Sequence, residues 1–445
     1  MRCRESVREP AGGRRGTAAR RSGSGAGAAV GAALLALALL GALPARAAIL
    51  VPMDEKQTDH LKAYGLAYWA LQQEQRVDWL LNYRGGSFLL LDDYAPALRE
   101  AALRGVAVET IGAADIAQIQ ATIADNNMES VKLEKAPRVA VYLPPNTVPW
   151  DDAVTLALTY AQIPYTTLWD EEVLRGDLAK YDWLHLHHED FTGQYGKFWA
   201  GFHDAPWYHE QVEVNEAMAK KLGFAKVTEL KHAVVEKIRS YVAAGGFMFG
   251  MCSATDTYDI ALATEGVDIA ADIYDGDPAD PDAQSKLDYS KTFAFRDFKL
   301  EMNPLIANDF SDIDCTQDVI RRGPESYFTL FEFSAKQDPV PTMLTQDHVN
   351  VVYDFLGQSS AFHRARLKPY VTVLASVEGT DEVKYLHGQY GKGTFTFFGG
   401  HDPEDFQHQV YDPPTDLSLH KNSPGYRLIL NNVLFPAAEK KKQKT

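Results

Sequence analysis

The chain has 445 residues and a formal net charge of −16, with 60 acidic against 44 basic side chains. Such an acidic chain repels phosphate backbones and anionic lipid surfaces, so nucleic acid is not expected as a partner. The length and the 46% hydrophobic composition suffice for two or three domains with cores of their own.

Residues 1–47 are predicted to be a signal peptide. Seven arginines precede the apolar run 28–43, and Ala45-Arg46-Ala47 is a small-x-small cleavage site. The run is short for a membrane span of about 20 residues, so a cleaved signal is favoured over a stable anchor. We therefore expect an exported protein, periplasmic or extracellular. Residues 1–47 hold eight Arg and two Glu, so without them the net charge is −22.

A small α/β unit is predicted over residues 48–130. Residues 49–52 form a short apolar run typical of a strand, and the segment 54–75 places its apolar side chains at helical spacing. Further apolar runs, a helical pattern from Ala95 to about Leu103 and Gly105 as its stop continue the alternation.

A larger α/β domain is predicted over residues 137–436. Strand-like runs such as 138–143 and 183–187 alternate with helical patterns, which is typical of a doubly wound, mostly parallel sheet. Residues 267–368 are rich in acidic loops and short strand-like runs, and we expect an insertion or lobe beside the main sheet. Residues 437–445 are expected to be a solvated basic tail.

Cys252 stands where a predicted buried strand, 246–251, turns into a helix. An α/β enzyme presents a nucleophile in this way, and a helix N-terminus favours the thiolate, so a lowered pKa is expected. The backbone N–H of Ser253 is placed to donate to an oxyanion. Two alternatives stay open: Cys252 is an inert core residue, or it forms a disulfide with Cys315.

His401 follows a second apolar strand, 394–398, and a Gly-Gly pair. That places it at the carboxyl end of a strand, where open α/β sheets keep their sites. A neutral imidazole there can take the thiol proton and return it to a leaving group. Three carboxylates in residues 402–405 lie near enough in sequence to orient the ring. The alternative is a surface turn stabilised by a hydrogen bond.

A third cluster of polar residues begins within the predicted strand 183–187, at His185, and continues into the loop after it. Five potential ligands in six residues can bind zinc or another divalent metal. The alternative is that His185 packs in the sheet and the others line a cleft through hydrogen bonds. No cofactor is firmly predicted, and a divalent metal is the candidate. The residues assigned to this cleft or metal site are His187, His188, Glu189 and Asp190.

The elbow Gly250-Met251-Cys252-Ser253-Ala254, together with His401-Asp402-Pro403-Glu404, resembles the class I glutamine amidotransferase-like superfamily. The resemblance covers residues 137–436 and implies a flavodoxin-like sheet. It also implies that Cys252 is the nucleophile, His401 the base and Glu404 the carboxylate that orients it.

Across the predicted mature chain, four segments are similar to exported bacterial proteins that are often labelled asparagine synthetase B. The motifs do not support that label, because no cysteine follows Met1 and no Ser-Gly-Gly-x-Asp loop is present to bind ATP. The segments are 63–69, 82–88, 187–190 and 251–256.

Three functions are therefore considered. The first is a Cys-dependent hydrolase or amidotransferase-like protein that acts on an amide or related carbonyl. The second is a noncatalytic module that binds a small ligand or glycan in the cleft. The third is a metal-dependent hydrolase built on His187, His188, Glu189 and His401. The expected substrates are small molecules, peptides or glycans, and the sequence indicates neither the substrate nor the assembly state.

Overall fold

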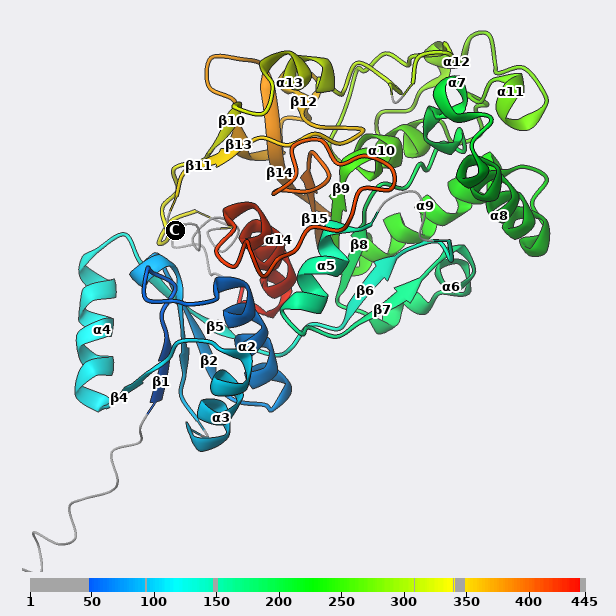
Figure 1. Ribbon diagram of the computed structural model, residues 1–445. Coiled ribbons are helices and arrows are strands. Elements are labelled where there is room, and N and C mark those ends of the chain that lie inside the picture. The colour runs from blue at the N-terminus through cyan, green and yellow to red at the C-terminus, as the bar shows by residue number, and fades with distance from the viewer. Residues whose placement is uncertain are drawn as a thin grey trace, which may run out of the picture. The chain divides into compact units, whose positions relative to one another are not determined.

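Two β-sheets and the helices packed on them make up the described part of the chain (Figure 1). The computed structural model describes residues 48–92, 94–146, 151–307, 309–338, 340 and 349–440. The predicted signal peptide, 1–47, and the last part of the predicted basic tail, 441–445, lie outside these residues. The α/β class predicted from the sequence is confirmed.

The N-terminal sheet has five strands in the order β4-β1-β3-β2-β5, and all of its pairings are antiparallel. It extends to Leu133, three residues beyond the predicted boundary. Its strands are β1 (Ala48–Val51), β2 (Val77–Leu81), β3 (Ser87–Leu90), β4 (Glu109–Ile111) and β5 (Glu129–Leu133), and its helices are α2 (His60–Gln72), α3 (Tyr94–Arg104) and α4 (Ala113–Asp125).

The second sheet has ten strands, of which five run parallel in the order β7-β6-β8-β9-β15. The parallel strands are β6 (Val139–Tyr142), β7 (Tyr165–Leu168), β8 (Trp183–Leu186), β9 (Phe247–Met251) and β15 (Gly393–Phe398). The other five strands are β10 (Tyr327–Leu330), β11 (Val351–Tyr353), β12 (Phe362–His363), β13 (Thr372–Ser376) and β14 (Glu382–Tyr390).

The sheet is mixed, so the expectation of a mostly parallel sheet needs a correction. β14 turns back through Gly391 and pairs antiparallel with β15, and β13, β10 and β11 continue that antiparallel half. Residues 267–368 were expected beside the sheet, but β10, β11 and β12 from this segment pair into it. β10 pairs with β13, β11 pairs with β10 at the edge of the sheet, and β12 pairs with β14.

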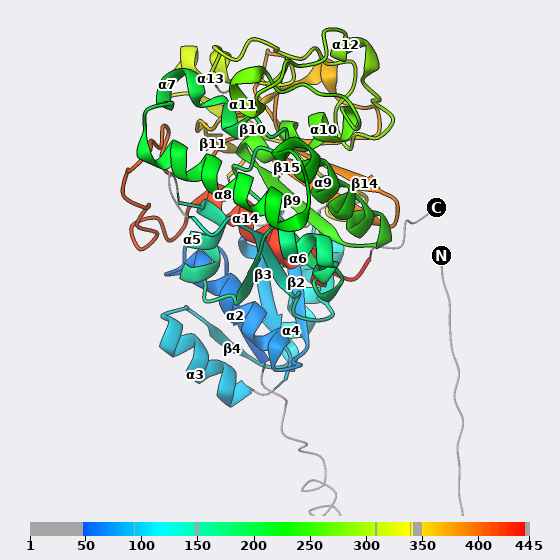
Figure 2. The same ribbon diagram turned by 90° about the vertical axis from the view of Figure 1, so that its right-hand side faces the viewer.

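Helices cover both faces of the large sheet. Alternate residues of the strands face opposite sides, so β9 places Phe249 in one apolar cluster and Met248 in the other. The first cluster also contains residues of α5 (Ala153–Tyr160), α14 (Pro424–Leu434) and the N-terminal sheet. The second contains residues of α6 (Asp170–Arg175), α9 (Val227–Ala244) and α10 (Asp256–Ala263). Figure 2 shows α9 on the near side of β9 and β15.

The remaining helices lie in the connections of the large sheet. They are α7 (Trp199–Phe202), α8 (Pro206–Leu222), α11 (Asp272–Asp275), α12 (Ala283–Lys286) and α13 (Thr316–Arg322). The described residues between 48 and 440 belong to one compact unit, because the N-terminal sheet and the large sheet contribute to the same apolar cluster.

Asp259 on α10 fixes the segment after it to the sheet. Its buried carboxylate accepts backbone N–H groups from Phe293 at 2.6 Å, Ala294 at 2.7 Å and Phe295 at 2.8 Å. Phe293 and Phe295 in turn pack in the second apolar cluster. The three hydrogen bonds offset the cost of burying the carboxylate only while all of them are kept.

Asp259→Asn is therefore expected to lower the free energy of unfolding by about 3 kcal/mol, because the amide turns a donor toward backbone donors. Urea unfolding followed by circular dichroism measures the change. Asp288→Asn is the matched control, since Asp288 is exposed, accepts hydrogen bonds from Ser290 and forms a surface ion pair with Lys291 at 3.9 Å, and it is expected to change stability by less than about 0.5 kcal/mol. Equal stabilities of the two variants would contradict this role of Asp259.

Candidate active site

The predicted functional residues gather at one edge of the large sheet. β6 leads through a loop to Asp152, β8 leads to His187, β9 to Cys252 and β15 to His401. These strands are parallel, so their carboxyl ends meet at the same edge. Open α/β sheets bind ligands at this edge, at the point where the strand order reverses, here between β6 and β8.

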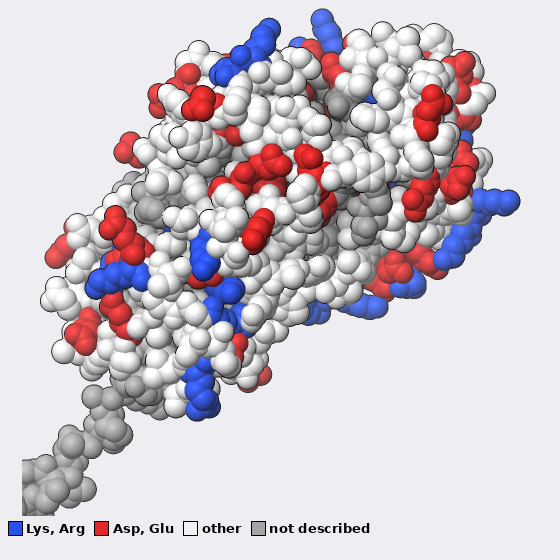
Figure 3. Space-filling view, viewed as in Figure 1, with Lys and Arg blue, Asp and Glu red and all other residues white. Residues whose placement is uncertain are grey.

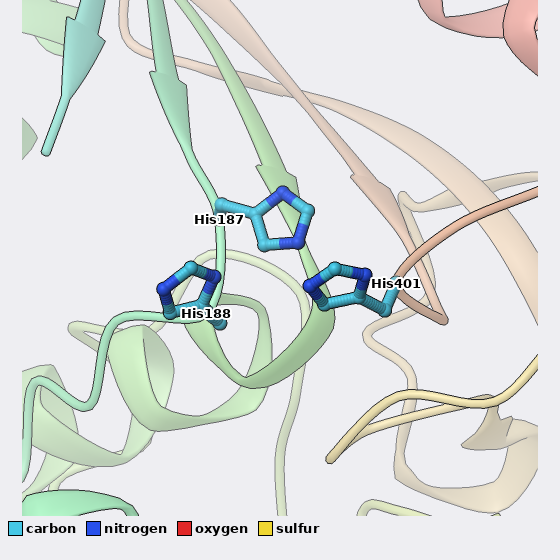
Figure 4. A group of neighbouring side chains, drawn as sticks. All are labelled: His187, His188 and His401. Carbon is cyan, nitrogen blue, oxygen red and sulfur yellow. The ribbon is translucent and has the colours of Figure 1, made fainter. Parts of the chain in front are cut away.

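Three histidines meet at that edge. The His187 ring centroid lies 4.5 Å from that of His401 and 4.9 Å from that of His188, and the other pair is 5.9 Å apart. One ring nitrogen of each lies within 4.8 Å of the others. Figure 4 shows the three rings turned toward one space, with His187 and His188 from the chain after β8 and His401 from the chain after β15.

Burial keeps these rings neutral. Burial is the main cause that lowers the pKa of His401 to about 3 and that of His188 to about 4, and it outweighs the opposing effect of Asp151 and Asp152. The pKa of His187 is also well below its ordinary value, again mainly because of burial. A neutral imidazole keeps a lone pair on one nitrogen, and this is the form that binds metal ions.

Asp152 approaches the cluster from the N-cap of α5. Its Oδ1 accepts the Thr155 N–H at 2.8 Å, while its Oδ2 lies 3.2 Å from His185 Nε2 and 3.6 Å from His187 Nδ1. Burial alone raises the pKa of Asp152, but the two histidines lower it overall, so the group is a carboxylate. Because Asp152 faces Nδ1 of His187, the nitrogen that this ring turns to the other two histidines is Nε2.

His408 stacks on the opposite side of His401, with ring centroids 5.1 Å apart and planes 5° from parallel. Its Nε2 lies 2.7 Å from Asp151 and its Nδ1 3.1 Å from Asp405. The hydrogen bond to Asp151 is the main cause that raises the pKa of His408 to about 9. A charged imidazolium therefore covers one face of His401 at neutral pH.

The turn at Cys252 is strained and the thiol is covered. Cys252 has a backbone φ of +53°, a value that residues other than glycine rarely adopt. Only 1% of the residue is exposed, and Sγ accepts the backbone N–H of Gln358 at 3.1 Å. Within the described residues, the sulfur is not among the atoms grouped with His187, His188 and His401.

Two expectations about Cys252 are wrong. Burial raises the pKa of the thiol to about 11, although the backbone N–H groups of Gln358, Ser359 and Ser253 lower it in part. The helix N-terminus was expected to lower this pKa, but desolvation of the sulfur outweighs it. The disulfide alternative is also excluded, because Cys252 and Cys315 are both free and buried.

The other predicted site residues have different partners. Ser253 is fully buried, and its N–H, which was expected to donate to an oxyanion, forms a hydrogen bond with the Cys252 sulfur. Glu404 was expected to orient His401, but its Oε2 lies 2.8 Å from Nδ1 of His420 and pairs with that ring instead. The sequence places Glu404 only three residues from His401, and the turn directs its side chain elsewhere.

The two acids after His188 stabilise the loop instead of joining the histidines. Glu189 Oε1 lies 2.8 Å from Nζ of Lys231, a buried lysine that also pairs with Asp170. Asp190 accepts three backbone N–H groups, those of Thr192, Gln194 and Gly196. Among the described residues that could ligate a metal, neither acid is grouped with the three histidines.

Sequence reasoning missed Asp151, Asp152 and His408. The acid pair directly precedes the first helix after β6, and that position at the carboxyl edge is a signal that could have been used. His408 gave no such signal, since it lies in a loop and reaches His401 only through the fold.

A cavity of about 840 Å³ lies elsewhere. It is lined by the first residues of β9 and β15, such as Phe247 and Gly393, so it opens at the amino ends of the parallel strands. The histidine cluster is at their carboxyl ends, and its chemistry makes it the stronger candidate. Among the described helices, none has the length and apolar character needed to cross a membrane.

Comparisons with known proteins leave the function open. No protein-family model matches the chain, and no curated protein does. A cytoplasmic protein from Salmonella typhimurium is 13% identical, with a TM-score of 0.33 over 70% of this chain and 91% of that one. A second, from strain LT2, is 12% identical, with a TM-score of 0.31 over 64% and 86%. Gan42B, a GH42 β-galactosidase, is 12% identical, with a TM-score of 0.26 over 60% and 28%. None of these likenesses is high enough to indicate a function for this chain.

The Cys252 thiol is expected to react slowly with iodoacetamide in the native protein, because it is buried and its pKa is about 11. In a variant that carries both Cys3→Ser and Cys315→Ser, the rate at pH 7 is expected to lie at least about 100-fold below that of free cysteine and to keep rising beyond pH 9. The same variant in denaturant is the control and reacts at the ordinary rate. A native rate that levels off below pH 8 contradicts the raised pKa.

Proposed function

We propose that this protein is a metal-dependent hydrolase in which His187, His188 and His401 hold a divalent cation. The observation that carries the proposal is the set of three ring nitrogens within 4.8 Å of one another, supplied by two strand ends of one sheet edge. Three protein ligands with one position left open are typical of catalytic zinc sites, whereas structural sites have four protein ligands. Glu189, which the sequence suggested as a ligand, is excluded from the set because it pairs with Lys231.

The chain's own groups support such a centre. The bound cation supplies a water of lowered pKa and polarises a carbonyl oxygen. Asp152 lies on the Nδ1 side of His187 and so directs Nε2 of that ring to the centre. Lys231 holds Glu189 and thereby fixes the backbone that carries His188. His408 stacks on His401 and restricts its rotation.

The surroundings favour neutral or cationic substrates. Asp405, Asp412 and Asp416 lie in the loop that follows His401, and the last two are exposed. Acidic side chains gather on the face of the molecule that carries this loop (Figure 3). Their field attracts cations and repels nucleic acid. We therefore propose a small molecule, peptide or glycan with an amide or related carbonyl as the substrate class.

The fold and the export of the protein belong to the same proposal. The parallel strands follow the order 2-1-3-4-5 of flavodoxin-like sheets, and the positive φ of Cys252 suits the elbow of glutamine amidotransferase-like proteins. We propose that residues 139–437 are a variant of that fold in which the histidine cluster, and not Cys252, carries out the reaction. The charged and apolar pattern of residues 1–47 supports export.

A Cys-dependent hydrolase remains the second candidate, and the strained backbone at Cys252 is the observation that favours it. Backbone strain of this kind is kept where the surrounding structure requires it, often at functional sites. The raised pKa of Cys252 and the coverage of its sulfur weigh against a thiolate nucleophile. The noncatalytic module that binds a small ligand or glycan would show no turnover in any substrate screen.

Metal content tests the proposal directly. The protein purified without chelators is expected to contain tightly bound divalent cations. His401→Gln is expected to lower their number by one per chain, because two histidines hold a cation at least about 100-fold more weakly than three. Plasma emission spectroscopy measures the content. Glu404→Gln is the matched control and is expected to keep the full content, since Glu404 pairs with His420. A wild-type protein without bound metal contradicts the proposal.

Turnover separates the metal-dependent from the thiol-dependent mechanism. In a screen of ester, amide and glycoside substrates, His188→Gln is expected to lower kcat/KM at least about 1000-fold, because the open metal position is lost. Cys252→Ala is expected to change it less than about fivefold. The opposite pattern, with activity lost in Cys252→Ala and kept in His188→Gln, favours the thiol mechanism.

A further inference from the structure

The Nδ1 side of His187 carries a second group of possible ligands. Asp152, His185 and His187 each offer one atom, and these atoms also lie within 4.8 Å of one another. All three side chains are buried, with exposed fractions of 3% for Asp152, 0% for His185 and 2% for His187. His187 therefore belongs to both groups, through a different nitrogen in each.

The hydrogen-bonding state of His185 leaves a gap in this group. Its Nδ1 lies 3.1 Å from the carbonyl oxygen of Phe249, and a carbonyl only accepts, so Nδ1 carries the hydrogen. The other nitrogen, Nε2, faces Oδ2 of Asp152 at 3.2 Å. A nitrogen and a carboxylate oxygen that face each other in a dry interior need a positive charge between them, either a proton or a metal ion.

One carboxylate oxygen faces both rings in this buried group. Oδ2 of Asp152 lies 3.2 Å from His185 Nε2 and 3.6 Å from His187 Nδ1. His187 Nδ1 has no hydrogen-bonding partner among the described residues. Three ligand atoms therefore converge on one small buried space.

The spacing of the three atoms suits a metal ion. With metal–nitrogen and metal–oxygen distances of about 2.0–2.2 Å, two ligands of a tetrahedral centre lie about 3.3 Å apart. The contacts of 3.2 Å and 3.6 Å from Oδ2 bracket that value. Imidazole and carboxylate together are ligands of zinc and similar divalent ions.

We infer that Asp152, His185 and His187 hold a second divalent cation, and that the His187 ring bridges the two cations through its two nitrogens. The bridge rests on the proposed function, since that proposal supplies the cation on the Nε2 side. A neutral His187 carries one hydrogen, so binding on both nitrogens releases that proton to solvent and leaves an imidazolate. The second cation balances the buried Asp152 carboxylate and fixes the ring that holds the first.

Counting cations in selected variants tests this inference. Apo protein is dialysed to equilibrium against buffered Zn²⁺, and bound metal is measured by plasma emission spectroscopy. Two equivalents per chain are expected for the wild type and for Glu404→Gln. One equivalent is expected for His185→Gln, which keeps the first site, and one for His401→Gln, which keeps the second. Circular dichroism and thermal melting confirm that each variant is folded.

The possible outcomes separate the two proposals. One equivalent in the wild type, unchanged in His185→Gln and lost in His401→Gln, overturns the second site and leaves the proposed function standing. No bound Zn²⁺ in the wild type overturns both. Two equivalents retained in His185→Gln also overturn the second site as assigned here.

A second variant keeps the test valid if His185→Gln does not fold, and a spectrum tests the bridge independently. Asp152→Asn keeps an N-cap acceptor for Thr155 and removes the charge, so it is expected to bind one equivalent. In Co²⁺ titrations of the wild type, the second equivalent is expected to change the visible absorption of the first, because the two ions share a ring. Identical spectra for the first equivalent and for the fully loaded protein, after scaling, would count against the bridge.

Discussion

The parallel register of four strands is the constraint on which the site depends. Pairing aligns Tyr142 of β6 with Leu186 of β8, Leu186 with Gly250 of β9, and Met251 with Phe398 of β15. Each strand ends within a few residues of these positions, so the side chains that follow emerge at one level. A shift of one residue in any pairing would turn its side chains to the other face of the sheet. Side chains on both faces of these strands are packed in the two apolar clusters, and a shift would disrupt the packing of both.

Burial then determines what the gathered groups can do. The same desolvation has opposite consequences for histidine and cysteine, because it favours the neutral form of each. A neutral imidazole is a better ligand than a charged one, so burial prepares His187, His188 and His401 to bind a metal ion. A neutral thiol is a poor nucleophile, so burial makes Cys252 unreactive. One physical effect thus favours the metal-dependent mechanism and disfavours the thiol-dependent one.

Local patterns in the sequence were enough to predict the α/β class and the strand ends that carry Cys252, His187, His188 and His401. Each of these residues lies within three positions of the end of an apolar run, and such a run indicates a buried strand without knowledge of its neighbours. The antiparallel half of the large sheet was not predictable in this way. Its strands β10 and β11 are three or four residues long, and their assignment depends on pairing with strands far along the chain.

The partners of the site residues were the least predictable part. Glu404 is close to His401 in sequence yet pairs with His420, and His408 reaches His401 only because its loop folds back. Asp152 and His185 are separated by 33 positions in the sequence and meet because β6 and β8 are neighbours. Proximity along the chain therefore predicted the wrong partner for Glu404, because sheet order and the paths of loops decide which side chains pair.

Gly357 bears on how well the Cys252 thiol resists oxidation. A Cβ at this position would lie 3.0 Å from Cys252 Sγ and 2.9 Å from the carbonyl carbon of Gly400, closer than packed atoms tolerate. The glycine thus lets the backbone lie directly on the sulfur, with no room for an added oxygen atom. Oxidation to sulfenic acid requires a thiolate and access, and Cys252 offers neither. The strained turn therefore holds a thiol that is protected from oxidants that would inactivate an exposed cysteine.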